Sequence, residues 1–133
     1  MKTFEIDGGD IWTLEDFYDQ ITRVLIPNAD LGLNLDIFDD ILRGGYGTPD
    51  EGFRLRWSDH NVSRQRLGYG ETVRQLEKRL KRCHRTMRAN VQADLDRARA
   101  GEGPTVFDWL VDIIRNHGPG GGEPKANVQL YLA

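Results

Sequence analysis

The chain has 133 residues, of which 38% are hydrophobic and 29% are charged, and its formal net charge is −3. This composition predicts one soluble globular domain over residues 1–133, because a chain of this length buries enough surface to form a core without disulfides or a structural metal. The single cysteine, Cys83, excludes an internal disulfide framework.

Targeting and metal-binding signals are missing from the sequence. The opening MKTFEIDGGD has acidic residues where a signal peptide needs an apolar core, and no run of about 18 apolar residues occurs. A lone cysteine suits a reducing compartment, so we expect a cytoplasmic protein that does not associate with membranes. No group of Cys and His residues has the spacing of a zinc site, and we expect neither a metal nor a cofactor.

The small net charge hides a separation of charge along the chain. Residues 1–50 contain eleven acidic and three basic residues, a net charge of −8. Residues 51–104 contain seven acidic and thirteen basic residues, a net charge of +6, and residues 105–133 have a net charge of −1. Such a separation indicates either a charged partner or pairing between the two sectors of the chain.

The first half of the chain is predicted to form two strands with two helices between them. Polar and apolar residues alternate at residues 3–7 and 53–57, which is typical of strands with one buried face. Apolar residues recur at helical spacing after Thr13, as far as Pro27, and from Asn34 to Arg43. Thr13 and Asn34 are residue types that cap helix N-termini, and Gly44 follows the second helix.

The second half is predicted to contain a short helix, a long helical segment, a last helix and a terminal strand, at residues 59–67, 72–99, 105–116 and 127–132. The long segment is one helix, or two with a break near Ala89 and Asn90. Strands separated by helices are typical of parallel sheets, because parallel strands need crossover connections. The fold class is therefore α/β, with a small three-stranded parallel sheet covered by helices.

Catalytic patterns are weak in this chain. The glycine-rich runs have no lysine followed by Ser or Thr, as a phosphate-binding loop requires, and they do not open a helix as a dinucleotide fingerprint does. His60, His84 and His117 stand apart from one another, and Cys83 lies on a predicted apolar stripe. A core or surface role suits each of them better than a nucleophile–base pair. We therefore expect no catalytic residues and no enzyme.

Two charged helical faces are candidate interaction surfaces. On the helix from Asn34 to Arg43, the carboxylates of Asp36, Asp39 and Asp40 share one face with Arg43. Taken alone, this strip is an ordinary solvated face, and it lacks the convergent ligands of a calcium or magnesium site.

The helical segment 72–99 carries the opposite charge, in Arg74, Lys78, Arg79, Lys81, Arg82, Arg85 and Arg88. Clustered cations can track nucleic-acid phosphates. However, acidic residues flank the run and no aromatic residues interleave with it, so nucleic acid is not the favoured partner. The simpler interpretation is a helix that packs through Leu76, Leu80, Cys83 and Met87, with its cations paired to the acidic sector.

The run from Gly32 to Leu42, GLNLDIFDDIL, resembles the signature of the barstar family, which is roughly G-x-N-L-D-A-L-x-D-x-L. These proteins are intracellular inhibitors of secreted bacterial ribonucleases. The order of elements is also similar over residues 2–67 and 104–132, including a strand that ends in Trp57. On this alignment, residues 69–103 are a helical insertion before the last helix, within the single domain.

The resemblance implies an immunity-type inhibitor that blocks a basic, guanyl-specific, barnase-like ribonuclease with an acidic helix, and that is a monomer when free. Asp40 matches the aspartate that imitates a substrate phosphate, and Asp36 matches its companion. An acidic contact on the last helix falls at Asp112, or at Glu77 if the family's last helix aligns with residues 71–76; we prefer Asp112, because its helix leads into the terminal strand. The implied partner-binding residues are Leu31, Gly32, Asn34, Asp36, Asp39, Asp40, Arg43, Tyr46 and Asp112.

The chain departs from the family at several aromatic positions. Asp30, Leu31, Asp39 and Gly45 stand where the family can have Tyr or Trp, and Tyr46 is the one aromatic residue close to the helix that can substitute. The alternative function is a non-inhibitory regulatory or interaction module with the same fold, in which the basic segment 72–99 binds nucleic acid or an acidic protein.

Overall fold

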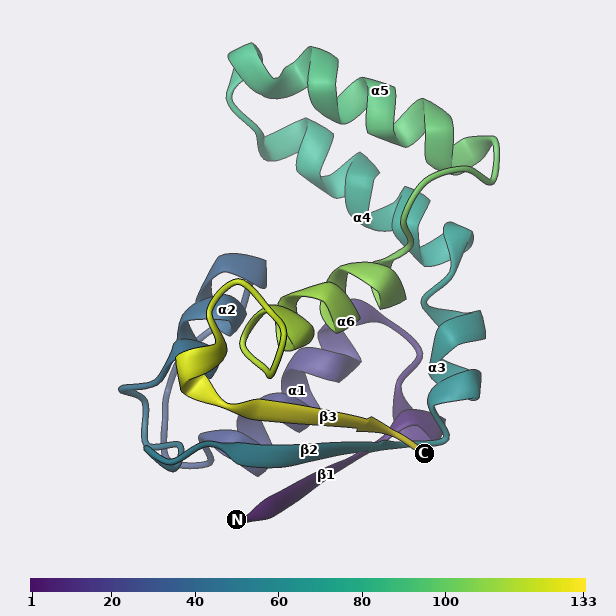
Figure 1. Cartoon of the computed structure of the whole chain (residues 1–133). Helices are drawn as coiled ribbons and strands as arrows, with labels where there is room; N and C mark the ends of the chain where they lie inside the picture. Colours follow the sequence, from purple (N-terminus) through teal and green to yellow (C-terminus); the bar gives the residue numbers. More distant parts are fainter.

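Three parallel strands form the sheet, as the computed structural model of residues 1–133 shows (Figure 1). They are β1 (Thr3–Asp7), β2 (Phe53–Ser58) and β3 (Val128–Leu132), with β2 in the centre. Along β2 the side chains alternate, so that Leu55 and Trp57 are buried whereas Arg54 and Arg56 are exposed. The predicted α/β class and the parallel three-stranded sheet are confirmed.

Six α-helices connect and cover the strands. They are α1 (Leu14–Leu25), α2 (Leu35–Arg43), α3 (His60–Arg66), α4 (Tyr69–Arg82), α5 (Arg88–Arg99) and α6 (Val106–Asn116). Figure 1 shows α1, α2 and α6 on the same side of the sheet, while α4 and α5 project away from it. None of these helices combines the length and apolar character needed to cross a membrane.

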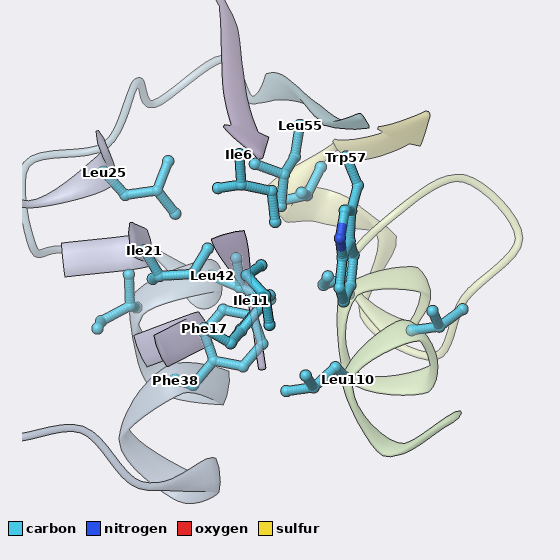
Figure 2. Close-up of a cluster of buried hydrophobic side chains, with 14 of the residues drawn as sticks. Ile6, Ile11, Phe17, Ile21, Leu25, Phe38, Leu42, Leu55, Trp57 and Leu110 are labelled. Atoms are coloured by element: carbon cyan, nitrogen blue, oxygen red, sulfur yellow. The ribbon is translucent and has the colours of Figure 1, made fainter. Parts of the chain in front are cut away.

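The main core fills the space between the sheet and the three covering helices (Figure 2). Phe17 of α1 meets Phe38 of α2 edge to face, with ring centroids 5.3 Å apart, and lies 5.2 Å from the ring of Trp57. The Trp57 indole donates a hydrogen bond to Ser63 Oγ at 3.0 Å, so its one polar atom is satisfied within the core. Leu110 of α6 closes the same cluster, which fixes α2 and α6 against the sheet.

Capping residues define where the covering helices begin. Thr13 accepts a hydrogen bond from the Asp16 backbone N–H and the Asp16 carboxylate accepts one in return, which starts α1. Thr105 and Asp108 form the same reciprocal pair at the start of α6. The predicted N-cap at Thr13 is therefore confirmed, and α6 begins with a cap of the same kind.

The predicted break near Ala89 and Asn90 is wrong. Helix α4 ends at Arg82, because the backbone of the next residue, Cys83, is extended with ψ 155°, and α5 begins at Arg88. The two helices form an antiparallel hairpin (Figure 1). Cys83 therefore ends a helix instead of lying in the middle of one, and Met87 is 48% exposed instead of packed. The hairpin has a small core of its own, formed by Leu76, Leu95 and Ala98.

Candidate partner-binding face

Helix α2 is rigidly placed by its cap and by its apolar face. The Asn34 side chain accepts a hydrogen bond from the Ile37 backbone N–H at 2.8 Å, and Gly44, with φ +115°, ends the helix. The buried face consists of Phe38, Ile41 and Leu42. The opposite face therefore carries its carboxylates on a helix that is fixed to the core.

The three predicted carboxylates of α2 differ in their surroundings. Asp36 is exposed and makes no ion pair, whereas Arg43 binds both of the other two. Its guanidinium donates from Nη1 to Asp40 Oδ1 at 2.6 Å and from Nη2 to Asp39 Oδ2 at 3.0 Å. The expected open strip of three carboxylates is thus one free aspartate and two that are engaged by a residue of the same helix.

Glu123 is a fourth carboxylate on this face, and the sequence interpretation missed it. It lies in the loop between α6 and β3, which runs beside α2 (Figure 1), and accepts from Arg43 Nε at 2.9 Å and from Nη2 at 3.2 Å. These hydrogen bonds lower the pKa of Glu123 and raise the pKa of Arg43. A separation of 80 residues between Arg43 and Glu123 gives no local sequence signal for this pair.

His117 lies beneath these charged groups. Its side chain is fully buried, and its Nε2 is 2.6 Å from Asp39 Oδ1. Its Nδ1 has no hydrogen-bond partner and is 3.5 Å from Glu123 Oε2. Of the two expected roles, core or surface, His117 has the core role, but the residue is not isolated, because it joins the α6–β3 loop to α2. Its backbone carbonyl also accepts from the Val128 N–H at 2.9 Å, which anchors the loop to β3.

The remaining residues of the implied site flank α2 in the chain. Leu31 is partly buried against the main core, and Gly32 is exposed with open space where a side chain would start. Tyr46, just after the helix, is 42% exposed. Tyr46 is therefore an accessible aromatic group that follows the carboxylate-bearing helix closely in the chain, and accessibility is what an interface anchor requires.

Asp112 makes no hydrogen bond or ion pair with the residues of α2 and shares no major cavity with them. Asp112 is exposed on α6 and lines a cavity of about 740 Å³ between α6, the glycine-rich loop and β3, to which α2 contributes no residue. The alternative contact, Glu77, is exposed on α4 and pairs with Arg99 of α5 at 3.4 Å. Of the two helices that carry these candidate contacts, α4 is followed by another helix, whereas α6, with Asp112, is followed by the terminal strand β3, as expected.

A groove of about 840 Å³ separates the start of α2 from helices α1 and α4. Asp36 and Asn34 line one side, and the cations of α4 line the other: Lys78, Arg79 and Arg82. Basic residues of α4 thus line the same groove as the start of the acidic helix, in keeping with the expectation that the basic segment lies against the acidic sector.

A scan against protein-family models matched residues 1–107 of this chain to the family described as Barstar (barnase inhibitor). The chain belongs to the barstar family. Neither the curated proteins nor the solved structures contain a match to it. The matched residues include all of α2 and the α4–α5 hairpin but end near the start of α6, so they do not reach Asp112, His117 or Glu123. A ribonuclease-inhibitor role is thereby established at the level of the family.

Proposed function

We propose that this chain inhibits a basic, guanyl-specific, barnase-like ribonuclease by binding its active site with α2. The observation that supports the proposal is a rigid helix that turns Asp36, Asp39 and Asp40 away from the core in a member of the barstar family. A ribonuclease needs Arg, Lys and His side chains to hold phosphate, and carboxylates can occupy the same donors. Inhibition then requires no chemical step, only exclusion of RNA.

Charge complementarity also predicts how the complex forms. Acidic groups concentrated on one helix attract a cationic active site at long range, and dissolved salt weakens this attraction. The association rate is therefore expected to fall as ionic strength rises. A rate that stays constant between low and high salt would contradict an encounter led by charge.

The test is a ribonuclease assay with a small guanyl-specific bacterial enzyme, titrated with the wild type and with Asp40→Ala. Wild type is expected to inhibit stoichiometrically, and Asp40→Ala to lose most of that inhibition, because it removes a carboxylate that the basic active site would bind. Asp19→Ala is the matched control, because Asp19 is an exposed aspartate on α1 outside the proposed face. Equal and negligible effects of the two substitutions would reject the assignment of this face.

We also propose that residues 69–103, which contain the α4–α5 hairpin, are an insertion in the inhibitor fold and that Asp112 extends the interface. Asp112→Ala and Glu77→Ala separate the two candidate contacts. Weaker inhibition by Asp112→Ala alone supports our assignment, and weaker inhibition by Glu77→Ala alone supports the other.

A second function has support from the tip of the hairpin. Lys81, Arg82, Arg85 and Arg88 are exposed and form no ion pair. This arrangement suits a non-inhibitory module that binds nucleic acid or an acidic protein. Retention on heparin that is lost in the triple variant Arg82→Ala, Arg85→Ala, Arg88→Ala would favour it, and no retention of the wild type would reject it.

A further inference from the structure

The carboxylates around the Arg43 guanidinium are arranged as in a binding site for this group. Four hydrogen bonds run from this one group to three carboxylates, two from α2 and one from the α6–β3 loop. Glu123 receives two of them side by side, from Nε and Nη2. A planar guanidinium satisfies such a set of acceptors, whereas the ammonium group of a lysine does not have the fork geometry.

The buried His117 contacts the carboxylate cradle, which we define as Asp39, Asp40 and Glu123, and one of its two ring nitrogens has no hydrogen-bond partner. His117 has no exposed surface, its Nε2 contacts Asp39, and its Nδ1 faces Glu123 at a distance too long for a hydrogen bond. Nδ1 is the one buried side-chain polar atom in the protein without a hydrogen-bond partner. A cavity of about 510 Å³ lined by His117, Arg43 and Glu123 gives the Glu123 carboxylate room to move. The Glu123 carboxylate is thus the acidic group nearest to the unpartnered Nδ1 and has space beside it.

A competing cation can reach the carboxylates that bind Arg43, because all the members of this ion-pair cluster are partly exposed. The Arg43 side chain is 49% exposed, and Asp40 and Glu123 are 49% and 44% exposed. Ion pairs between groups this exposed add little stability, because water solvates the separated charges almost as well. The same carboxylates bind a cation more strongly when a partner covers them and excludes water.

We propose that Asp39, Asp40 and Glu123 form a guanidinium-binding site, that Arg43 fills this site in the free protein, and that an arginine of the partner replaces Arg43 on binding. The proposal rests on the proposed function for the identity of the partner, and it adds Glu123 as a contact residue and Arg43 as an internal competitor. Because Arg43 must leave, the site selects partners that present an arginine at this position over those that present a lysine.

The first experiment needs no partner protein. Arg43→Ala is titrated with N-acetyl-arginine amide and, separately, with N-acetyl-lysine amide, and backbone amide shifts are followed by NMR. We expect saturable shifts at Asp39, Asp40 and residues 122–125, with binding roughly tenfold tighter than in wild type and tighter for arginine than for lysine. Adding Glu123→Gln to Arg43→Ala should abolish the preference for arginine.

Arg23→Ala serves as the matched control, because Arg23 is an exposed arginine in the last turn of α1 with no carboxylate partner. It should behave like wild type. Binding by Arg43→Ala that does not saturate, or that equals wild-type binding, would overturn the proposal. Circular dichroism and the melting temperature of each variant show whether it is folded, and an unfolded Arg43→Ala is replaced by Arg43→Gln, which keeps the length of the side chain.

The second experiment uses a ribonuclease that the wild type inhibits. Arg43→Ala is expected to bind it roughly three- to tenfold more tightly, and Glu123→Gln more weakly by a similar factor, because the first removes a competitor and the second a contact. Unchanged affinity of both variants would reject the exchange of arginines. If wild type inhibits no ribonuclease, the proposed function fails, while the NMR titration still decides whether the cradle binds a guanidinium.

Discussion

Two ion-pair networks in this protein have similar composition but different burial. The α1–α4 network joins Glu71, Arg74, Gln75 and Lys78 of α4 to Glu15 of α1. The α2–loop network joins Asp39, Asp40 and Arg43 of α2 to His117 and Glu123. The buried member of the α1–α4 network is a carboxylate, since the Glu71 side chain is 5% exposed. The buried member of the α2–loop network is His117, and all the carboxylates of that network are partly exposed to solvent.

This difference separates a structural role from a binding role. Glu71 accepts a hydrogen bond from the Leu14 backbone N–H at 2.8 Å, at the first residue of α1, and also from Arg74 and Gln75. A buried carboxylate with such partners cannot release them without stranding its charge. Exposed carboxylates over a buried histidine can exchange partners at little cost. The first network therefore holds the hairpin to the core, and the second leaves its carboxylates able to bind the cationic partner that we propose.

The largest effect is expected from Glu71→Ala. This change removes the acceptor for the Leu14 N–H and one of the two carboxylates that pair with Arg74, and we expect the free energy of unfolding to fall by about 2–4 kcal/mol. Glu77→Ala is the matched control on the same helix, because Glu77 is 48% exposed and its one ion pair, with Arg99, spans 3.4 Å. Urea unfolding of both variants measures the difference, and equal losses would contradict the structural role of the buried carboxylate.

The local features of this comparison were predictable from the sequence, but the tertiary ones were not. Asn34 at the start of an amphipathic run and glycine at its end predicted α2 and its carboxylate face correctly, because capping and periodicity act over a few residues. The pairs of Arg43 with Glu123 and of Asp39 with His117 join residues about 80 positions apart, so no spacing in the chain encodes them.

The hairpin shows a second limit of the sequence. A continuous apolar stripe predicted one helix through residues 72–99, or two helices with a break near Ala89. The first helix instead ends before Cys83, and the chain reverses its direction there. The spacing of apolar residues stays helical across the reversal, so periodicity alone could not locate it. Pairing of the basic segment with the acidic sector was expected, and the contacts of Arg74 and Lys78 with Glu15 confirm it.

An intermediate effect is expected from His117→Leu, which keeps the apolar volume but removes the contact with Asp39. Loss of a buried hydrogen bond to a charged group should lower the free energy of unfolding by about 1–2 kcal/mol. Because His117 anchors the start of the α6–β3 loop, amide hydrogen exchange should also become faster at Gly118 and Gly121, whose N–H groups donate to the carbonyls of Arg115 and Gly118. Unchanged exchange there would mean that the loop is held by its backbone contacts alone.

The smallest effect concerns the pH dependence of Glu15 in the α1–α4 network. Partial burial raises the pKa of Glu15, but hydrogen bonds from Arg74 and Lys78 outweigh it and lower this pKa from 4.5 to about 2. A lowered pKa means that the native state favours the ionised carboxylate, so its stabilisation is present above pH 4.5 and is lost as pH falls toward 2.

Glu15→Gln removes this dependence, because the amide does not titrate. Between pH 5 and pH 2.5 the wild type should therefore lose more unfolding free energy than the variant, by less than about 1 kcal/mol, since the Glu15 side chain is 45% exposed and water screens its ion pairs. Parallel urea titrations at the two pH values measure the difference. A variant that loses as much stability as wild type would show that Glu15 adds nothing to the attachment of the hairpin and that the buried Glu71 carries the α1–α4 network alone.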